Sequence, residues 1–352
     1  MNYIGSKYSL LDFLETSIEN VAGKNGQTFC DLFAGTGAVG SHFKKLGYKI
    51  TANDIQYYSY VLNRHYIGNS KPMRFNGLAD IITSKMLPEN PAAAVCDYLS
   101  QLDGTEGFLY KNYAPTGSQK NGTQRIYFSD ENAMKCDAVR TQIEDWKTDG
   151  KITENEYYFL LASLLESIDA RANTASIYGA FLKKLKKTAR KPLQLRAVNL
   201  IEDDKDHDVY QSDVNVLIKK ISGDIFYLDP PYNHRQYGAN YHLLETAARY
   251  DSPSIHGKTG LRDEEIRSAY CLRSSVKQAF TDLIMNADAK YIFVSYNNEG
   301  IMPLDDIQNI LGKRGEYGCF TKQYRRFKAD AETNRRIGEK ETTEYLHYVK
   351  VK

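Results

Sequence analysis

The sequence lacks any long apolar run, and no stretch approaches the roughly 18 apolar residues that a membrane helix needs. The first residues, Met-Asn-Tyr-Ile-Gly-Ser-Lys, contain no apolar core of a signal peptide. Cysteine is scarce: five residues are scattered along 352 positions without a Cys-x-x-Cys pair, which argues against a disulfide framework and against a zinc site. We therefore expect a cytoplasmic globular protein that has no membrane contact and binds no metal.

An excess of one charge is also missing. The 46 lysines and arginines are balanced by 44 acidic residues, which leaves a net charge of +2. This balance does not identify a polyanionic partner, so any nucleic-acid surface must be a local patch. The length is sufficient for one large domain or two ordinary ones with a substantial core.

The most informative stretch is an apolar strand that ends in an acid, two prolines and a tyrosine. Ile225 to Leu228 is a continuous apolar run, typical of a strand buried on both faces of a parallel sheet. The prolines end strand pairing because they lack an N–H. Ligands of open α/β sheets bind beyond the carboxyl ends of the strands. We therefore predict a catalytic motif there, with a plain strand-ending turn as the alternative; its residues are Asp229, Pro230, Pro231 and Tyr232.

This motif suits the methylation of an exocyclic amine. The lone pair of such an amine is delocalised into its aromatic ring, so the nitrogen is a poor nucleophile. Two acceptors aimed at its N–H groups, the Asp229 carboxylate and the Pro230 carbonyl, would favour the tetrahedral nitrogen of the transition state. Tyr232 offers a flat face on which a nucleobase can stack.

A glycine-rich turn follows a second predicted strand, Thr28 to Phe33, and precedes a helix. This order is typical of a nucleotide site, because glycine lets the backbone approach a ligand closely. Asp54 ends the next strand candidate, 19 residues after Gly35, where an acid would meet ribose hydroxyls. A solvated strand end is the alternative for Asp54.

The alternation of strands and helices stops after a helix at Tyr57 to Tyr66 and resumes near Asp208. Between them we predict helices at Ala93 to Leu102, Ala133 to Trp146 and Asn155 to Ala170. The polar segment Asn112 to Ser129 lies between two of these helices, and its Lys120 and Arg125 could reach base edges. We interpret the whole region as an inserted, mostly helical domain.

Tyr178 to Lys191 is predicted to form a helix with one broad basic face. The face consists of Lys183, Lys184, Lys186, Lys187 and Arg190. It is interpreted either as a phosphate-contacting surface or as an ordinary solvated face.

Three further segments follow the central pattern. Asp213 stands at the end of a short strand, where it could accept from an adenine amino group, cap a helix, or do both. Asn233 to Asn240 is a polar segment after the catalytic motif and a candidate lid. Cys319 to Phe327 and Tyr345 to Lys350 are predicted to form a hairpin at the sheet edge.

Taken together, these motifs resemble the alpha group of DNA adenine-N6 methyltransferases, the Dam type. The shared order is a Lys-bearing motif at Tyr3 to Lys7, the Phe-x-Gly-x-Gly motif at Phe33 to Gly37, a helical insert, and Asp229 to Tyr232. The resemblance implies an α/β fold: a Rossmann-like class I methyltransferase sheet with an inserted, mostly helical target-recognition domain. The implied boundaries are a catalytic part at 1–66, the insert at 67–196, and a second catalytic part at 197–352.

The resemblance also implies S-adenosylmethionine as cofactor and a flipped adenine in double-stranded DNA as target. Asp169 to Thr174 is similar to restriction-associated members, which implies a cognate restriction endonuclease as a further partner. The implied cofactor-binding residues are Tyr3, Lys7, Asp31, Phe33, Ala34, Gly35, Thr36, Gly37, Asp54, Ile55, Asp213 and Val214. The predicted DNA-binding residues are Lys120, Arg125, Lys183, Lys184, Lys187 and Arg190.

Three other functions remain open on the sequence. An RNA base methyltransferase could use the same motif on guanine N2, but such enzymes usually lack an insert at this point. A protein glutamine methyltransferase usually has asparagine in place of Asp229. A non-catalytic nucleotide-binding or DNA-binding module would not need the catalytic motif.

Overall fold

A computed structural model describes residues 5–24, 28–82, 90–234, 236–263, 267–325 and 341–352. The chain divides into two compact units. The sheet unit consists of Ile4–Asn63, Asp203–Gln236 and Glu265–Lys352. The helical unit consists of Met1–Tyr3, Arg64–Glu202 and Tyr237–Glu264.

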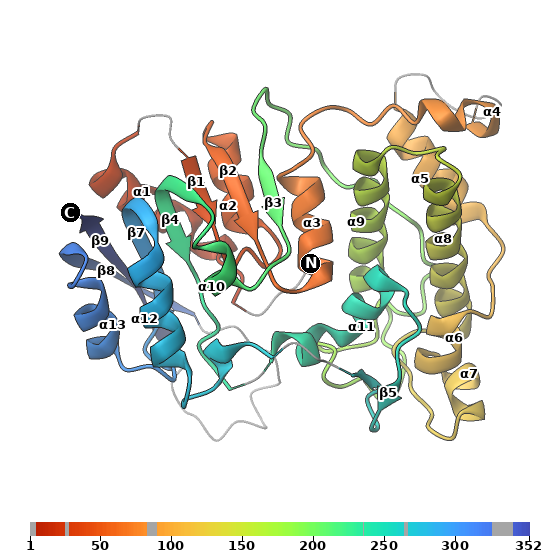
Figure 1. The fold of residues 1–352 in the computed structure, drawn as a ribbon. Helices are drawn as coiled ribbons and strands as arrows, with labels where there is room; N and C mark the ends of the chain where they lie inside the picture. Colours follow the sequence, from red (N-terminus) through yellow and green to blue (C-terminus); the bar gives the residue numbers. More distant parts are fainter. Residues whose placement is uncertain (1–4, 25–27, 83–89, 235, 264–266, 326–340) are drawn as a thin grey trace. The chain divides into compact units, whose positions relative to one another are not determined.

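The sheet unit is built on seven strands in the order β3-β2-β1-β4-β7-β9-β8 (Figure 1). Their bounds are β1 Thr28–Asp31, β2 Lys49–Asn53, β3 Asp208–Tyr210, β4 Ser222–Leu228, β7 Asp288–Asn297, β8 Gly315–Arg325 and β9 Glu341–Val351. β1 pairs in parallel with β2 and β4, whereas β9 runs antiparallel to both β7 and β8. The strand order reverses between β1 and β4, and this is where open α/β sheets bind ligands.

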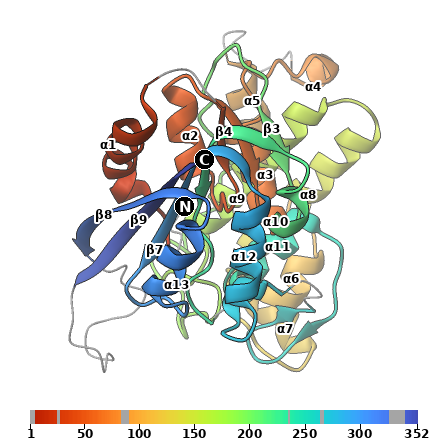
Figure 2. The same cartoon turned by 60° about the vertical axis from the view of Figure 1, so that its left-hand side comes forward.

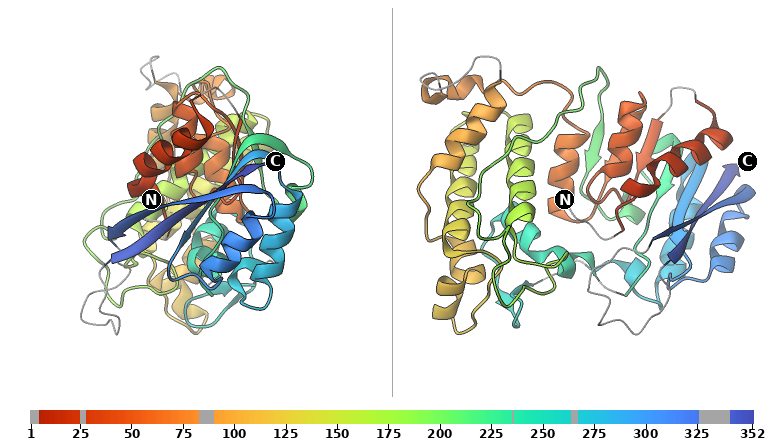
Figure 3. Two further views of the ribbon diagram at one scale, coloured as in Figure 1. Left: turned by 90° about the vertical axis from the view of Figure 1, so that its left-hand side faces the viewer. Right: turned by 180° about the vertical axis from the view of Figure 1, so that it is seen from behind.

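Helices cover both faces of this sheet. Their bounds are α1 Leu11–Ala22, α2 Ala38–Lys45, α3 Tyr57–Tyr66, α10 Val214–Leu217, α12 Val276–Asn286 and α13 Leu304–Leu311. α1 and α2 lie on one face, and α12 and α13 lie on the other (Figures 2 and 3). Alternate residues of β1 serve the two layers: Phe29 stacks on Phe43 of α2 at 3.9 Å between ring centroids, and Cys30 joins the core formed with Phe280 of α12. The predicted α/β sheet and its edge hairpin, β8 with β9, are confirmed.

The helical unit contains the three helices expected from the sequence. The bounds of its helices are α4 Ala79–Ile82, α5 Pro91–Gln101, α6 Phe108–Tyr113, α7 Pro115–Lys120, α8 Asp130–Thr148, α9 Glu154–Arg171 and α11 Tyr237–Arg249, and a small hairpin joins β5 Ile255–His256 to β6 Leu261–Arg262. α8 and α9 pack side by side (Figure 3). Thr153 and Glu156 form a capping box at the start of α9, and Ser129 caps α8.

The prediction of a helix at Tyr178 to Lys191 was wrong, because this segment has irregular structure. Asn173 explains the difference. Its backbone carbonyl accepts from the Leu182 N–H at 2.9 Å, and its side-chain oxygen accepts from the Lys186 N–H at 2.9 Å. These long-range bonds satisfy backbone groups that a helix would pair internally, so tertiary contacts override the local helical pattern.

The division of the chain also differs from the predicted boundaries. Residues 237–264, which include α11, lie in the helical unit rather than in the second catalytic part. Tyr178 N–H donates to the Asn240 carbonyl at 2.9 Å, and the buried Arg140 guanidinium donates to carbonyls of Ala247 and Ala248.

Within the described ranges, no helix is both long enough and apolar enough to span a bilayer.

Candidate active site

The sequence motifs after β1 and β4 meet at the carboxyl edge of the sheet. In the β1–β4 register Asp31 is opposite Tyr227, and the Leu32 N–H donates to the Tyr227 carbonyl at 3.2 Å. Because both strands run in the same direction, the glycine-rich turn and Asp229 emerge side by side.

The glycine-rich turn adopts a conformation that favours glycine. Gly35 and Gly37 have φ angles of 53° and 78°, in the left-handed region, and α2 begins directly after Gly37. Asp54 is tied to this turn: its Oδ2 accepts from the Gly35 N–H at 2.8 Å and its Oδ1 from the Gln56 N–H at 2.9 Å. Asp54 is therefore more than a solvated strand end, although its contact with a ribose stays a prediction.

Two asparagines that the sequence analysis did not single out hold this edge together. Asn53, at the end of β2, donates to the carbonyls of Leu32 and Ser212 at 3.2 Å each and accepts from the Ser212 N–H at 3.0 Å. Asn63 of α3 donates to the Gly35 carbonyl at 3.0 Å. Both side chains are buried, so they fix the loops after β1 and β3.

Asp31 carries a buried oxygen that the protein leaves without a hydrogen bond. Its Oδ2 accepts from the Gly40 N–H at 3.0 Å, whereas its Oδ1 is buried and unpartnered. Burial, together with the nearby Asp229 and Asp54 carboxylates, raises the pKa of Asp31 to about 8 although the Gly40 N–H opposes this. A buried acceptor beside a glycine turn fits the ammonium of the methionine end of S-adenosylmethionine.

The loops after β1, β2 and β3 carry the remaining predicted cofactor residues. Asp213 accepts from the Asn215 N–H at 2.8 Å and caps α10, so the predicted capping role is confirmed. Val214 is buried beneath it, and Ile55 is half-buried after β2. Phe33 contacts the Tyr270 ring edge-to-face at 5.1 Å, while Ala34 is buried and Thr36 half-buried in the turn. Tyr3 lies outside the described residues.

Lys7 joins two carboxylates beneath the catalytic motif. Its Nζ lies 3.1 Å from Asp229 Oδ1 and 2.9 Å from Glu344 Oε1 of β9. The Lys7 side chain is 4% exposed and that of Glu344 is 0% exposed, so the charges interact out of water. Burial alone would lower the pKa of Lys7, but the two carboxylates outweigh it and hold that pKa well above its ordinary value. Lys7 therefore serves Asp229 directly, a contact that its predicted cofactor role did not include.

Asp229 keeps a proton more readily than an ordinary aspartate. Burial raises the pKa of Asp229 to about 6, with Lys7 lowering it and Glu344 raising it. Above this pH the carboxylate is ionised and can only accept hydrogen bonds. Pro230 is buried and Pro231 is half-buried, which keeps the backbone of the motif fixed.

Tyr232 is held from two sides. Its carbonyl accepts from the Ile301 N–H at 3.1 Å, and its ring contacts Tyr296 edge-to-face at 6.4 Å between centroids. Lys7 Nζ lies 5.7 Å from the Tyr232 ring centroid. The ring is thus fixed beside Asp229, as a stacking platform requires.

The predicted DNA-binding residues of the helical unit fall into two groups. Arg125 is buried, and its guanidinium donates to the carbonyls of Asn112, Gly257 and Lys258 at 3.2, 2.9 and 3.2 Å. The interpretation of Arg125 as a base reader is therefore corrected: it joins α6 to the β5–β6 hairpin. The others are exposed, namely Lys120, Lys183, Lys184, Lys187 and Arg190. Lys186 of the predicted face instead donates to the Thr174 carbonyl at 2.8 Å.

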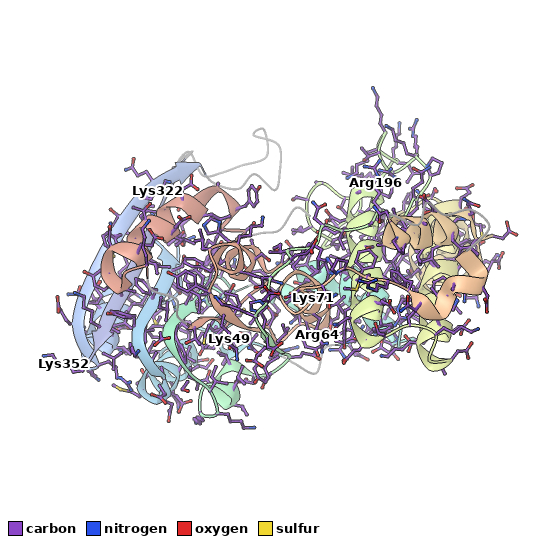
Figure 4. All side chains as sticks on the ribbon, turned by 90° about the horizontal axis from the view of Figure 1, so that it is seen from above. Lys49, Arg64, Lys71, Arg196, Lys322 and Lys352 are labelled. Atoms are coloured by element: carbon purple, nitrogen blue, oxygen red, sulfur yellow. The ribbon has the colours of Figure 1, made fainter. Side chains whose placement is uncertain are left out.

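Basic side chains occur on both units. Figure 4 labels Lys49 and Lys322 on the sheet unit and Arg64 and Arg196 on the helical unit. The 46 lysines and arginines of the sequence are nearly balanced by its 44 acidic residues. A polyanion would therefore have to be recognised by particular clusters rather than by the overall field.

Glu344 of β9 and its neighbour Ser295 of β7 were not predicted from the sequence. Ser295 Oγ donates to Glu344 Oε1 in a short hydrogen bond, and both residues are fully buried. The only sequence signal was a glutamate and a serine in otherwise apolar strand patterns, since Glu344 precedes the run Tyr345 to Lys350 and Ser295 interrupts Tyr291 to Tyr296. A buried polar residue in a strand needs a partner, and here the partner is Lys7.

The strand order, with the glycine-rich turn and Asp229 at its switch point, fits the predicted Rossmann-like class I methyltransferase fold. The model of the D12 class N6 adenine-specific DNA methyltransferases matches residues 3–310. The type II methyltransferase M.NlaIII of Neisseria lactamica is 52% identical over 99% of this chain and 98% of its own length. M.CviAII of Paramecium bursaria Chlorella virus 1 is 32% identical over 99% and 98%.

M.FokI of Planomicrobium okeanokoites is 39% identical over 99% of this chain, which spans 52% of that relative's length. The rRNA methyltransferase aviRa of Streptomyces viridochromogenes covers 98% of this chain and 86% of its own at 10% identity and a TM-score of 0.30, too low to support any functional argument. The chain belongs to the D12 class N6 adenine-specific DNA methyltransferases.

Membership identifies the reaction as site-specific methylation of adenine N6 in DNA, with S-adenosylmethionine as the methyl donor. It favours DNA over the RNA alternative and rules out a non-catalytic binding module. The glycine turn, the Asp54 carboxylate and the unpartnered Asp31 oxygen fit that donor.

Proposed function

We propose that Asp229 and the Pro230 carbonyl accept the two N–H groups of the target adenine. The observation that carries this proposal is the Asp229 carboxylate, which lies at the end of β4 and is held through one oxygen by Lys7 at 3.1 Å. Because Lys7 holds one carboxylate oxygen, the second oxygen of Asp229 is available to accept a hydrogen bond from the target amino group. Acceptors fixed in advance lower the barrier most, because no reorganisation is needed when charge develops.

The amino nitrogen gains positive charge as its lone pair bonds to the methyl carbon. When bound, the cofactor would supply that methyl group from its sulfonium and leave as the neutral thioether, and the methylated amino group would then lose one N–H proton. Asp229, ionised above a pKa of about 6, stabilises the developing charge through its hydrogen bond. Tyr232 stacks on the adenine, which must leave the duplex because its amino group is engaged in pairing there.

The cofactor is proposed to bind along the carboxyl edge of β1, β2 and β3. Asp31 would receive its ammonium, Phe33 to Gly37 would line it, Asp54 would bind the ribose, and Asp213 with Val214 would face the adenine ring. Support comes from the hydrogen bonds of Asn53, which hold the loops carrying these residues in one arrangement.

The helical unit is proposed to recognise the DNA sequence. Exposed polar residues of α7 and the following loop, including Lys120, are available for bases, and the exposed Lys183, Lys184, Lys187 and Arg190 are available for phosphates. The relatives named as type II methyltransferases support a cognate restriction endonuclease as a partner of this enzyme.

The test compares Asp229→Ala and Asp229→Asn with the unchanged protein in single-turnover methylation of genomic DNA from a methylation-free host. We expect the rate to fall by at least about 10² to 10³, the usual cost of removing one preorganised electrostatic partner. Cofactor affinity, measured by calorimetry, should change little. A variant that keeps the full single-turnover rate would refute the role of Asp229.

A further inference from the structure

Glu344 is a fully buried carboxylate that the proposed mechanism does not use. It lies on β9 opposite Asn297 of β7, and its Oε1 is 2.9 Å from Lys7 Nζ. Ser295 Oγ donates to the same oxygen. Three strands and the segment before α1 therefore contribute to one buried cluster: Asp229 after β4, Ser295 on β7, Glu344 on β9 and Lys7.

The charges of this cluster do not balance. A buried ion pair of Lys7 with Asp229 alone would be neutral, whereas Glu344 adds a second carboxylate that shares the same ammonium. A buried charge that is only partly compensated costs several kcal/mol of stability. An apolar residue at position 344 would avoid this cost, so the second carboxylate indicates a functional role.

We propose that Glu344 is a positioning residue for methyl transfer: it shares the Lys7 ammonium with Asp229 and thereby makes the Asp229 carboxylate a stronger hydrogen-bond acceptor for the target amino group. Lys7, held at two points, fixes Asp229 Oδ1 in place. The Glu344 charge keeps Lys7 from neutralising Asp229 fully, so Asp229 retains the basicity that favours a developing ammonium. This inference rests on the proposed role of Asp229.

The other ionisable groups that face Asp229 or Glu344 have pKa values well away from pH 6. These groups are Lys7, Tyr227, Tyr232, Asp31 and His347. Burial raises the pKa of Tyr227 and of Tyr232, so both stay neutral near pH 6, and it lowers the pKa of His347 to about 4. Burial, together with the Asp229 and Asp54 carboxylates, raises the pKa of Asp31 to about 8. A change of rate near pH 6 therefore reports on Asp229 coupled to Lys7 and Glu344.

The decisive experiment measures single-turnover methylation of genomic DNA from a methylation-free host, between pH 5 and 8, for Glu344→Gln. Glutamine keeps an acceptor oxygen for Lys7 and Ser295 but removes the negative charge. The matched control is Glu316→Gln on β8, an exposed carboxylate of the same hairpin that lies 3.9 Å from Lys350. Folding of each variant is checked by thermal unfolding.

The acid limb of the pH–rate profile is the range in which the rate falls as Asp229 becomes protonated. For Glu344→Gln we expect this limb to move to lower pH, because a charge that raises the pKa of Asp229 is gone. The plateau rate should fall at least about threefold, because a less basic carboxylate is a weaker acceptor. Cofactor affinity should not change, and Glu316→Gln should match the unchanged protein. An unmoved acid limb in folded Glu344→Gln would overturn the proposal, because a merely structural glutamate would alter stability and leave the limb in place.

A second measurement needs no substitution at Glu344. In the unchanged protein with ¹³C-labelled carboxyl groups, one glutamate resonance should shift at the same pH as Asp229, which is identified by its loss in Asp229→Asn. If no glutamate responds, the coupling is refuted even when Glu344→Gln does not fold. Failure of the proposed function looks different: Asp229→Asn would keep the full rate, or the unchanged protein would have no acid limb near pH 6.

Discussion

Asn53 makes the sharpest structural prediction, because one buried amide joins the ends of three neighbouring strands. Its side chain forms three hydrogen bonds, to the Leu32 carbonyl and to the carbonyl and N–H of Ser212. A typical intramolecular hydrogen bond contributes about 0.5 to 1.5 kcal/mol, and unpaired buried groups cost more. Asn53→Ala should therefore lower the free energy of unfolding by about 2 to 4 kcal/mol.

The same substitution should weaken cofactor binding, although Asn53 is not expected to touch the cofactor. Leu32 precedes the glycine turn and Ser212 precedes Asp213, so both binding loops lose their common anchor. Urea unfolding and calorimetry with S-adenosylmethionine measure the two effects. The matched control is Asn286→Ala, because Asn286 is exposed and its side-chain amide donates to Asp282 of the same helix, α12.

Two results would refute this reasoning. A loss below about 1 kcal/mol would mean that water replaces the amide without cost, contrary to its burial. If the free energy of unfolding falls by the predicted amount but the cofactor affinity does not change, the loops after β1 and β3 do not depend on Asn53 for their positions.

Three further predictions concern Asp31, the pair Lys187 and Arg125, and Tyr232. Burial raises the pKa of Asp31 to about 8 in the folded protein, whereas an aspartate of the unfolded chain has a pKa of about 4. The contribution of this group to the free energy of unfolding therefore falls as the pH rises between these values. Asp31→Asn should flatten this pH dependence, as measured by urea unfolding. Lys187→Ala should weaken binding to all DNA sequences about equally and reduce the salt dependence, whereas Arg125→Ala should lower stability through its three lost carbonyl contacts. Tyr232→Ala should lower the rate and the fluorescence change of a 2-aminopurine placed at the target adenine, and a mismatched target should partly restore both.

Each of these has a contradicting outcome. An unchanged pH slope in Asp31→Asn would place the pKa of Asp31 near its ordinary value. Sequence-dependent losses in Lys187→Ala would make Lys187 a base contact rather than a phosphate contact. No rescue of Tyr232→Ala by the mismatch would argue against stacking as the role of this ring.

The α/β sheet, the glycine-rich turn after β1 and the Asp229 to Tyr232 motif after β4 could be predicted from the sequence. These follow from short patterns: an apolar run before Asp229, glycines at Gly35 and Gly37 where φ is positive, and prolines that end a strand. Such patterns are local, because backbone conformation and strand burial depend mainly on near neighbours in the chain. The helices α5, α8 and α9 were predictable for the same reason.

Which polar side chains lie together could not be predicted from the sequence. Lys7, Asp229 and Glu344 are far apart in the sequence and meet because three strands run side by side. The irregular course of residues 178–191 likewise depends on hydrogen bonds to Asn173, which a helical periodicity does not reveal. Arg125 was indistinguishable from a surface base reader until its three carbonyl partners were known. A charged residue's role is set by the partners that compensate its burial, and folding selects those partners across the whole chain.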